Sequence, residues 1–372
     1  MRHMKKLFFL FLLLVQYTYA QELALVNKDG KFGYISKKGD FVIEAKFVNA
    51  KNFSDGLAAA EDNGRWGYIN KKGEWAIPAT FNEAKYFNSG IAVVAKGKEW
   101  MYINKDGETL KSPITDKVFD FEDGVAIIRQ NKKVGLIDAK MNVVIAPKYD
   151  IIKSFENGYA RVKLHDRWGM IDKNGKEVVE VAYDDIGNYH KNTTWAKRGT
   201  SYGLVRNGKF ILIDGVDKIW DFHIEDVTYA RKNGKVGFIN LDGEWIILPQ
   251  YDKARAFVKN LAPVHNGSKW GYVNMKGVMV IEPKYDDAEI FSKDGLAPVK
   301  EKDWGFINQE GVMVIPAKYG ITAGLATFFG DSEKGFIDGV ARVKNDKKWG
   351  FITTDGSALG NQWFNNAEPF QK

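Results

Sequence analysis

The chain has 372 residues, with 54 Lys and Arg against 47 Asp and Glu, an aromatic content of 14% and no cysteine. Acidic and basic residues are interleaved, so there is no basic stripe for nucleic acid, and the lack of cysteine excludes disulfide bonds and thiolate chemistry. The aromatic content and the mere 9 prolines indicate a folded globular chain.

The first twenty residues have the layout of a secretory signal peptide. Arg2, Lys5 and Lys6 precede an apolar run, and the small residue Ala20 follows it. The run is shorter than the about 20 apolar residues that a membrane span needs, and no other apolar stretch approaches that length. We therefore predict a signal peptide over residues 1–20, cleavage near Ala20, an extracytoplasmic location (periplasmic or secreted) and no integral membrane span.

Residues 21–372 carry an internal repeat of 34 residues. Its most regular mark is a glycine that usually follows an aromatic residue, and we call this position the anchor. Met101 fills the position once, and the last step is longer by 11 residues. The anchors are Gly33, Gly67, Met101, Gly135, Gly169, Gly203, Gly237, Gly271, Gly305 and Gly350. The sequence thus predicts a single domain of ten repeats, with an 11-residue insertion near residues 320–338.

The second repeat shows the expected local structure. "WGYIN" (66–70) and "EWAIPA" (74–79) are rich in aromatic and branched residues and predict two strands. The turn between them starts with Asn70 and ends with Gly73, as in a hairpin turn closed by a left-handed glycine. A glycine beside Trp66 lets another backbone or ring lie flat against the strand.

The repeat offers about three short strands and no helix of normal length, which predicts an all-β fold of tandem β-hairpin repeats. A single 34-residue unit cannot bury its apolar face, so neighbouring units must stack. We expect an open curved β-solenoid, because 34 residues are few for a four-stranded blade and known propellers usually have four to eight blades. The alternative is a closed β-propeller-like ring, which would remove the terminal edges.

The repeat resembles the WG-repeat (KWG) family, whose pattern runs from G-L-A through W-G-[YF]-I-[DN] and K-x-G to a strand that ends in P-x-[YF]. "GLAAAEDNGRWGYINKKGEWAIPATF" and "GLAPVKEKDWGFINQEGVMVIPAKYG" carry this pattern almost whole, and the resemblance covers essentially all of residues 21–372. It implies a bacterial, frequently exported, all-β repeat scaffold.

The fifth and sixth inter-anchor units depart most from the repeat, over "DDIGNYHKNTTWAKRGTSYGLVRNGKFILIDGVDKIWDFHIEDVTYA". Tyr189 and His223 fall where other units have Phe, which suggests that His190 and His223 are neighbours. Three interpretations remain open: repeat drift with compensating packing, a groove in which aromatic rings hold a sugar or a peptide, and a two-histidine metal site that lacks a third ligand. The ligand-binding candidates here are Tyr189, His190, Trp195, Trp220 and His223.

The insertion adds Phe328 and Phe329 as candidates, since insertions between repeats often lie on a binding face. No catalytic, phosphate-binding or metal-binding motif occurs, so we predict no enzyme activity, no cofactor and no metal. The leading hypothesis is an exported scaffold that binds a protein or a cell-envelope glycan. The alternatives are a glycan-active enzyme, which would need paired carboxylates such as Asp184, Asp185 and Glu225, and a purely structural envelope protein.

Overall fold

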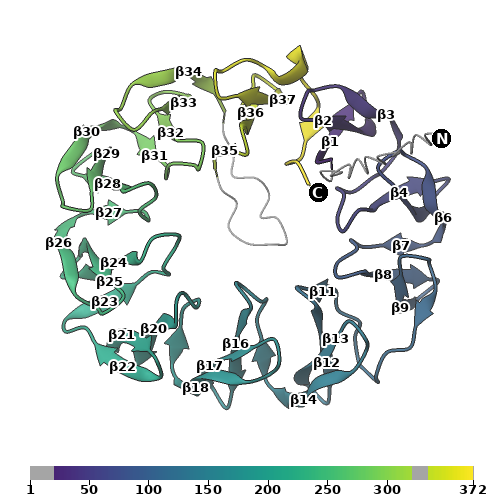
Figure 1. The fold of residues 1–372 in the computed structure, drawn as a ribbon, viewed down its shortest axis with the longest axis horizontal. Helices are drawn as coiled ribbons and strands as arrows, with labels where there is room; N and C mark the ends of the chain where they lie inside the picture. The colour runs from purple at the N-terminus through teal and green to yellow at the C-terminus, as the bar shows by residue number, and fades with distance from the viewer. Residues whose placement is uncertain (1–20, 321–333, 372) are drawn as a thin grey trace, which may run out of the picture.

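A computed structural model describes residues 21–320 and 334–371. They form ten small antiparallel sheets arranged as a ring, in which each sheet is one blade (Figure 1). Within these residues there is no α-helix, and the one helical turn is a 3-10 turn, η1 (Leu359–Asn361). The protein is therefore all-β, as the sequence predicts, and it is a ten-bladed β-propeller.

The first five blades follow the chain. Blade 1 contains β1 (Leu23–Lys28), β2 (Lys31–Ser36), β3 (Phe41–Phe47) and β38 (Asn366–Ala367); blade 2 contains β4 (Ala58–Asp62), β5 (Arg65–Ile69) and β6 (Trp75–Phe81); blade 3 contains β7 (Glu83–Ala84), β8 (Ile91–Lys96), β9 (Glu99–Asn104) and β10 (Thr109–Leu110); blade 4 contains β11 (Phe121–Glu122), β12 (Val125–Gln130), β13 (Lys133–Asp138) and β14 (Val143–Tyr149); blade 5 contains β15 (Ile151–Ile152), β16 (Tyr159–Leu164), β17 (Arg167–Asp172) and β18 (Glu177–Tyr183).

The second half of the ring repeats this order. Blade 6 contains β19 (Asp185–Ile186), β20 (Thr193–Arg198), β21 (Ser201–Arg206) and β22 (Lys209–Leu212); blade 7 contains β23 (Val216–Ile219), β24 (Val227–Lys232), β25 (Lys235–Asn240) and β26 (Trp245–Tyr251); blade 8 contains β27 (Lys253–Ala254), β28 (Leu261–Asn266), β29 (Lys269–Asn274) and β30 (Met279–Tyr285); blade 9 contains β31 (Asp287–Ala288), β32 (Ala297–Lys300), β33 (Trp304–Ile307) and β34 (Met313–Tyr319); blade 10 contains β35 (Phe336–Ile337), β36 (Val340–Asn345) and β37 (Lys348–Thr353).

In most blades the anchor glycine belongs to the strand next to the outermost one and lies under the backbone of that outermost strand. A Cβ at Gly67 would stand 2.6 Å from Ala79 N and Ile77 O, closer than any side chain tolerates. The outer strand crosses there because its register is shifted between the pairs Trp66–Phe81 and Tyr68–Ile77. The predicted close approach of a backbone is thus present, and that backbone belongs to the same blade.

Met101, the one exception among the anchors, stands where this crossing strand is shortened. In blade 3 the outer strand β10 pairs only Thr109 and Leu110 with β9, and residues 111–120 form no strand. The methionine side chain therefore has room that the equivalent positions of other blades lack.

The predicted open solenoid is wrong, and the alternative closed ring is what the structure shows. The C-terminal strand β38 pairs antiparallel with β1, with Val26 opposite Ala367 and Asn27 opposite Asn366. The backbones of Leu23 and Gln371 also exchange two hydrogen bonds, of 3.0 and 2.9 Å. The last residues of the chain thus supply the innermost strand of the first blade, and the two ends of the chain close the ring (Figure 1).

A 34-residue repeat holds a four-stranded blade because the innermost strands are very short. In blades 3, 5, 6, 8 and 9 this strand has only two residues, so four strands fit within 34 residues. Figure 1 shows these short strands, such as β27 and β31, nearer the middle of the ring than the long outer strands β30 and β34. A blade of this kind needs a shorter repeat than a blade with four long strands.

The hydrophobic core is divided among the junctions between blades. Within the described residues, one cluster of buried side chains lies at each of the ten junctions, including the junction of blade 10 with blade 1. At the junction of blades 2 and 3, for example, Tyr68, Ile77 and Phe81 pack against Ala84 and Phe87. Each blade therefore buries its faces only by contact with its two neighbours, as the repeat predicts.

Candidate functional site

Most junctions are closed by an aromatic pair. The residue after the anchor is Tyr or Phe, and its ring contacts a Phe from the inner segment of the next blade, as Tyr68 does with Phe87 at 4.6 Å and Tyr272 with Phe291 at 5.2 Å. Four of these tyrosines also donate a hydrogen bond, of 2.7–2.8 Å, to a backbone carbonyl of the next blade: Tyr34 to Lys51, Tyr68 to Lys85, Tyr102 to Phe119 and Tyr272 to Glu289.

Three consecutive junctions, from blade 4 to blade 7, lack this pair. The residue after the anchor is aliphatic there, namely Leu136, Met170 and Leu204. The residues that take the place of the inner Phe are Phe155, Tyr189 and His223, and all three are half-buried, as is Phe370 at the closing junction, whereas Phe53, Phe87, Phe121, Phe257, Phe291 and Phe336 are buried. The loss of the aromatic partner thus leaves the inner side of these junctions open.

A pocket of about 720 Å³ lies across blades 5, 6 and 7 at this break. Four of the candidates from the sequence line it: Tyr189, His190, Trp220 and His223. The other residues of its lining are Glu156, Asn157, Tyr159, Asn188, Lys191, Asp221, Phe222, Ile224, Tyr229 and Ala256. The pocket is within the size range of small-ligand sites, and it combines aromatic rings with many hydrogen-bonding groups.

Trp195 does not line the pocket but holds a residue that does. Its indole Nε1 donates to Asp221 Oδ1 at 2.6 Å, and the same oxygen accepts the backbone N–H of Asn188 at 2.9 Å. Gly187 makes this contact possible, since a Cβ there would lie 2.1 Å from the indole nitrogen and 2.2 Å from the carboxylate. Trp195 and Gly187 therefore fix Asp221 at the edge of the pocket.

The two histidines are in different surroundings. His190 stacks on Phe222 with ring centroids 5.8 Å apart, and its Nε2 lies 2.9 Å from Asp226 Oδ1. Lys191 Nζ lies 2.8 Å from the other oxygen of Asp226, and the hydrogen bonds from Lys191 and His190 lower the pKa of Asp226. His223 Nδ1 is buried with no hydrogen-bond partner among the described residues.

The largest rings of the pocket are supported by neighbouring side chains. Trp220 stacks on Tyr229 with centroids 4.7 Å apart, and Lys218 Nζ lies 4.5 Å from its ring centre. Tyr189 meets Tyr159 edge-on at 4.6 Å, and burial together with Tyr159 raises the pKa of Tyr189. Because these contacts restrict the rings, the aromatic part of the pocket is preorganised.

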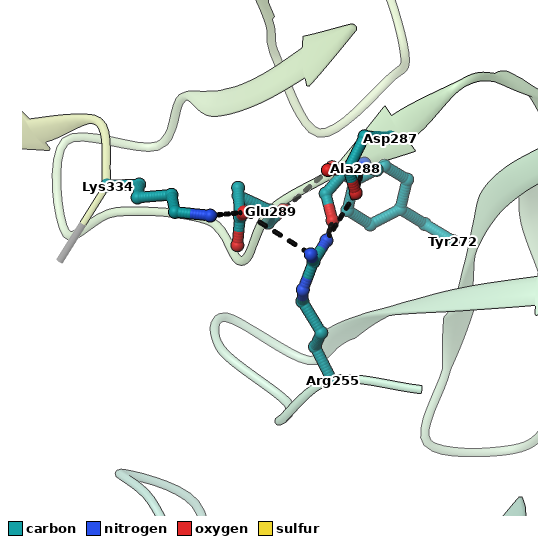
Figure 2. A network of polar contacts seen from close by, with 6 residues as sticks. All are labelled: Arg255, Tyr272, Asp287, Ala288, Glu289 and Lys334. Carbon is teal, nitrogen blue, oxygen red and sulfur yellow. Dashed lines mark hydrogen bonds and ion pairs between the residues drawn. The ribbon is translucent and has the colours of Figure 1, made fainter. Parts of the chain in front are cut away.

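Blades 8 to 10 show how the same region is closed elsewhere (Figure 2). Glu289 is only 7% exposed, and its Oε1 lies 3.3 Å from Arg255 Nη2 and 2.5 Å from Lys334 Nζ. Arg255 also binds Asp287 at 2.9 Å and stacks over Trp270 at 4.5 Å. Arg255, Glu289 and Lys334 each stand sixteen residues before an anchor, so equivalent positions of three successive blades form an ion-pair chain.

Other predicted residues do not join the pocket. Phe328 and Phe329, like the signal peptide over residues 1–20, lie outside the described residues. Asp184, which the enzyme alternative would need, binds Arg167 with one carboxylate oxygen and accepts the backbone N–H of Gly199 with the other. Both oxygens therefore make structural contacts. Over residues 21–320 and 334–371, no three acidic or histidine side chains come close enough to hold a metal ion.

Residues that the sequence did not single out are Asn188 and Asp221 in this pocket, Asp226, which binds His190 and Lys191, and Phe155 at the preceding junction. One signal could have found Phe155: the residue after the anchor is aliphatic at Leu136, Met170 and Leu204, and nowhere else among the glycine anchors. Asp221 gives no such signal, because its role depends on a hydrogen bond with Trp195, 26 residues away in the sequence.

The chain belongs to the family of the WG containing repeat. The family model matches residues 32–66, 66–100, 100–133, 135–168, 168–199, 237–270, 270–303 and 304–320. The match leaves out residues 200–236, which include Trp220 and His223 of the pocket. The predicted resemblance is thus confirmed, and part of the pocket lies in a segment that the family model does not match.

One solved structure shows a similar fold at low identity, and two others resemble the chain more weakly. A crystal structure described as "the eukaryotic initiation factor" is 9% identical, with a TM-score of 0.50 over 94% of this chain and 98% of that one. Hsv2 of Kluyveromyces lactis is 9% identical, with a TM-score of 0.32 over 62% of this chain and 87% of that one. The dihydro-heme d1 dehydrogenase NirN is 11% identical, with a TM-score of 0.34 over 80% of this chain and 73% of that one. The first supports the fold alone, and no curated protein matches the chain.

No helix in the part of the chain that the structure describes has both the length and the apolar character to cross a membrane.

Proposed function

We propose that this protein is an exported, non-catalytic β-propeller scaffold that binds a cell-envelope glycan in the pocket of blades 5 to 7. The observation that carries the proposal is the gathering of Tyr189, His190, Trp220 and His223 in one pocket. Rings of this kind give a sugar a large apolar contact area, and Asn188 and Asp221 beside them offer hydrogen bonds to hydroxyl groups.

The proposed export rests on the first twenty residues, whose basic start, apolar run and Ala20 have the layout of a signal peptide. The measurement is N-terminal sequencing of the protein from its natural host, with cell fractionation. A mature chain that starts after residue 20 outside the cytoplasm agrees with the proposal. A chain retained whole in the cytoplasm contradicts it.

The binding itself is tested by affinity chromatography of the mature chain on purified envelope polysaccharides, followed by calorimetric titration with fragments of any that retain it. Trp220→Ala and Tyr189→Ala are each expected to weaken binding at least tenfold, since each removes a main apolar contact. Trp75→Ala is the matched control, because Trp75 is 39% exposed and belongs to blade 2. The melting temperature of each variant shows whether the fold is kept.

The other hypotheses predict different results of the same experiment. Release of reducing sugar during incubation would make the protein a glycan-active enzyme. Retention of an envelope protein, with no polysaccharide bound, would make the partner a protein. Binding of neither would leave a purely structural envelope role.

A further inference from the structure

The position sixteen residues before the anchor divides the ring into two parts. Its occupants in blades 2 to 10, followed by the C-terminal segment that joins blade 1, are Lys51, Lys85, Phe119, Lys153, Gly187, Asp221, Arg255, Glu289, Lys334 and Glu368. From Asp221 onward the charges alternate in sign, and in blades 8 to 10 they pair with one another. Blades 2 to 5 carry only lysine and phenylalanine at this position.

The three lysines of this set meet in one pocket. Lys51, Lys85 and Lys153 all line a second pocket, of about 560 Å³, whose lining comes from blades 2 to 5. Its apolar lining includes Phe119, Ile127, Leu136 and Phe155. Leu136 and Phe155 form the first of the three junctions without an aromatic pair, so this pocket has the same structural origin as the glycan pocket and contains different residues.

Carboxylates balance these lysines only in part. Lys85 Nζ lies 3.1 Å from Asp120 Oδ2, but within the described residues no carboxylate lies within ion-pair distance of Lys51 or Lys153. Instead, Lys51 lies 5.5 Å from the ring centres of Trp66 and Tyr86, and Lys153 lies 6.0 Å from that of Trp168. Asp120 and Glu122 are the acidic residues of the lining, so lysines exceed carboxylates there.

The ionisation of Lys51 agrees with this excess of cations. Burial lowers the pKa of Lys51, the carboxylates of Glu83 and Asp120 oppose this shift, and the neighbouring Lys85 adds to it. Because the pKa is still lowered, these carboxylates do not fully offset the burial of the charge, and a bound anion would stabilise the protonated lysine.

We propose that this pocket is a second binding site, which takes a small amphipathic anion: an apolar ring or chain that carries one carboxylate, sulfonate or phosphate group. The apolar part would contact Phe119, Ile127, Leu136 and Phe155, and the anionic group would lie beside the lysines of the lining, Lys51, Lys85 and Lys153. The proposal does not depend on the glycan function, because the two pockets share no lining residue.

The test uses two dyes of similar size on the folded mature chain at low salt. Anilinonaphthalene sulfonate carries the anion, and N-phenyl-1-naphthylamine lacks it. We expect Lys51→Met and Lys153→Met each to weaken binding of the sulfonate dye about tenfold, the effect of losing about 1.4 kcal/mol of charge interaction, and to leave the neutral dye within about twofold. Phe155→Ala is expected to weaken both dyes.

The control is Lys148→Met, since Lys148 also lies over an aromatic ring, Tyr149 at 4.9 Å, but lines neither pocket. Lys153→Met keeps the test decisive if Lys51→Met does not fold, which circular dichroism would show. Unchanged sulfonate binding in a folded Lys153→Met variant would overturn the proposal, as would equal losses for both dyes. Loss of sulfonate binding in Trp220→Ala would place the dye in the glycan pocket and would also overturn it.

Discussion

Blades 8 to 10 and blades 5 to 7 have the same strand order but differ in how their inner ends are closed. In blades 8 and 9, Tyr272 covers Phe291 and donates to the Glu289 backbone, while the Glu289 side chain joins Arg255 to Lys334. In blades 5 to 7 the corresponding aromatic partners are missing, and Tyr189 and His223 line a pocket. A few side chains at fixed repeat positions thus decide whether a junction is closed or able to hold a ligand.

The largest effect should come from breaking the closed side at Glu289. Glu289→Gln removes the one negative charge between Arg255 and Lys334, and loss of one partner from a buried ion pair costs about 3 kcal/mol. Urea denaturation should show this loss of stability. Asp242→Asn is the control, since Asp242 pairs with Arg206 at 62% side-chain exposure and should change stability by under about 1 kcal/mol. Equal effects in the two variants would mean that burial of Glu289 adds nothing.

Tyr272→Leu would give a closed junction the residue type found in the open one at Leu204. The variant loses a buried ring contact and a hydrogen bond of 2.8 Å, so we expect a loss of about 2 kcal/mol. The measurement is the denaturation midpoint, together with uptake of the neutral dye. An unchanged midpoint would show that the aromatic pair does not hold the junction.

Alkaline pH should weaken the closed junctions through their buried tyrosines. Burial raises the pKa of Tyr102 to about 12, well above its usual value near 10. A raised folded-state pKa stabilises the protein fully below pH 10, and this stability is lost as the pH rises from 10 to 12, at about 1.4 kcal/mol per pH unit. Tyr102→Phe should reduce the slope of stability against pH in this window. An identical slope in the variant would contradict the assignment.

The smallest effect is expected on the open side, at Gly187. Gly187→Ala places a Cβ against the Trp195–Asp221 hydrogen bond, and displacing these two side chains should cost about 1 kcal/mol. Because Asp221 lines the pocket, glycan binding should fall by more than the stability change explains. Gly199→Ala is the control, as a Cβ there would meet no atom within 4 Å, although its positive φ gives a strain cost of its own. A Gly187→Ala variant that binds normally would show that Asp221 is not part of the site.

Much of the fold was predictable because each repeat contains the residues that determine its own strands and turns. Turn glycines such as Gly73, with φ of 79°, and Asn70, whose Oδ1 accepts the N–H groups of Lys72 and Glu74, set the hairpins locally. Four of the five candidates from the central units line one pocket. The sequence marks them because the residue pattern of the repeat departs most in these units, while the 34-residue step is kept. Trp195 is close to these candidates in the sequence, but its indole donates to Asp221 and does not itself line the pocket.

The sequence also contains a sign of ring closure, because the strands of the first blade are offset from the repeat: its innermost strand comes from the C-terminal segment. The first repeat begins at Leu23, after the position of an innermost strand, and the chain ends with the segment that provides one. Both an open solenoid and a closed ring are compatible with this offset. The rotation between successive blades decides whether the first and the last repeat meet. At the closing junction Gly39 packs on Gly360, where other turn glycines, such as Gly73, pack on an isoleucine of the preceding blade.

The sequence by itself determined the strands, the turns, the 34-residue period and the place where the period fails, because these depend on residues close together in the chain. Only the tertiary structure decided that β38 joins β1, that Glu289 joins Arg255 to Lys334, and that three lysines from separate blades share one pocket. These features depend on the angle between successive blades, which comes from side-chain packing summed over ten junctions.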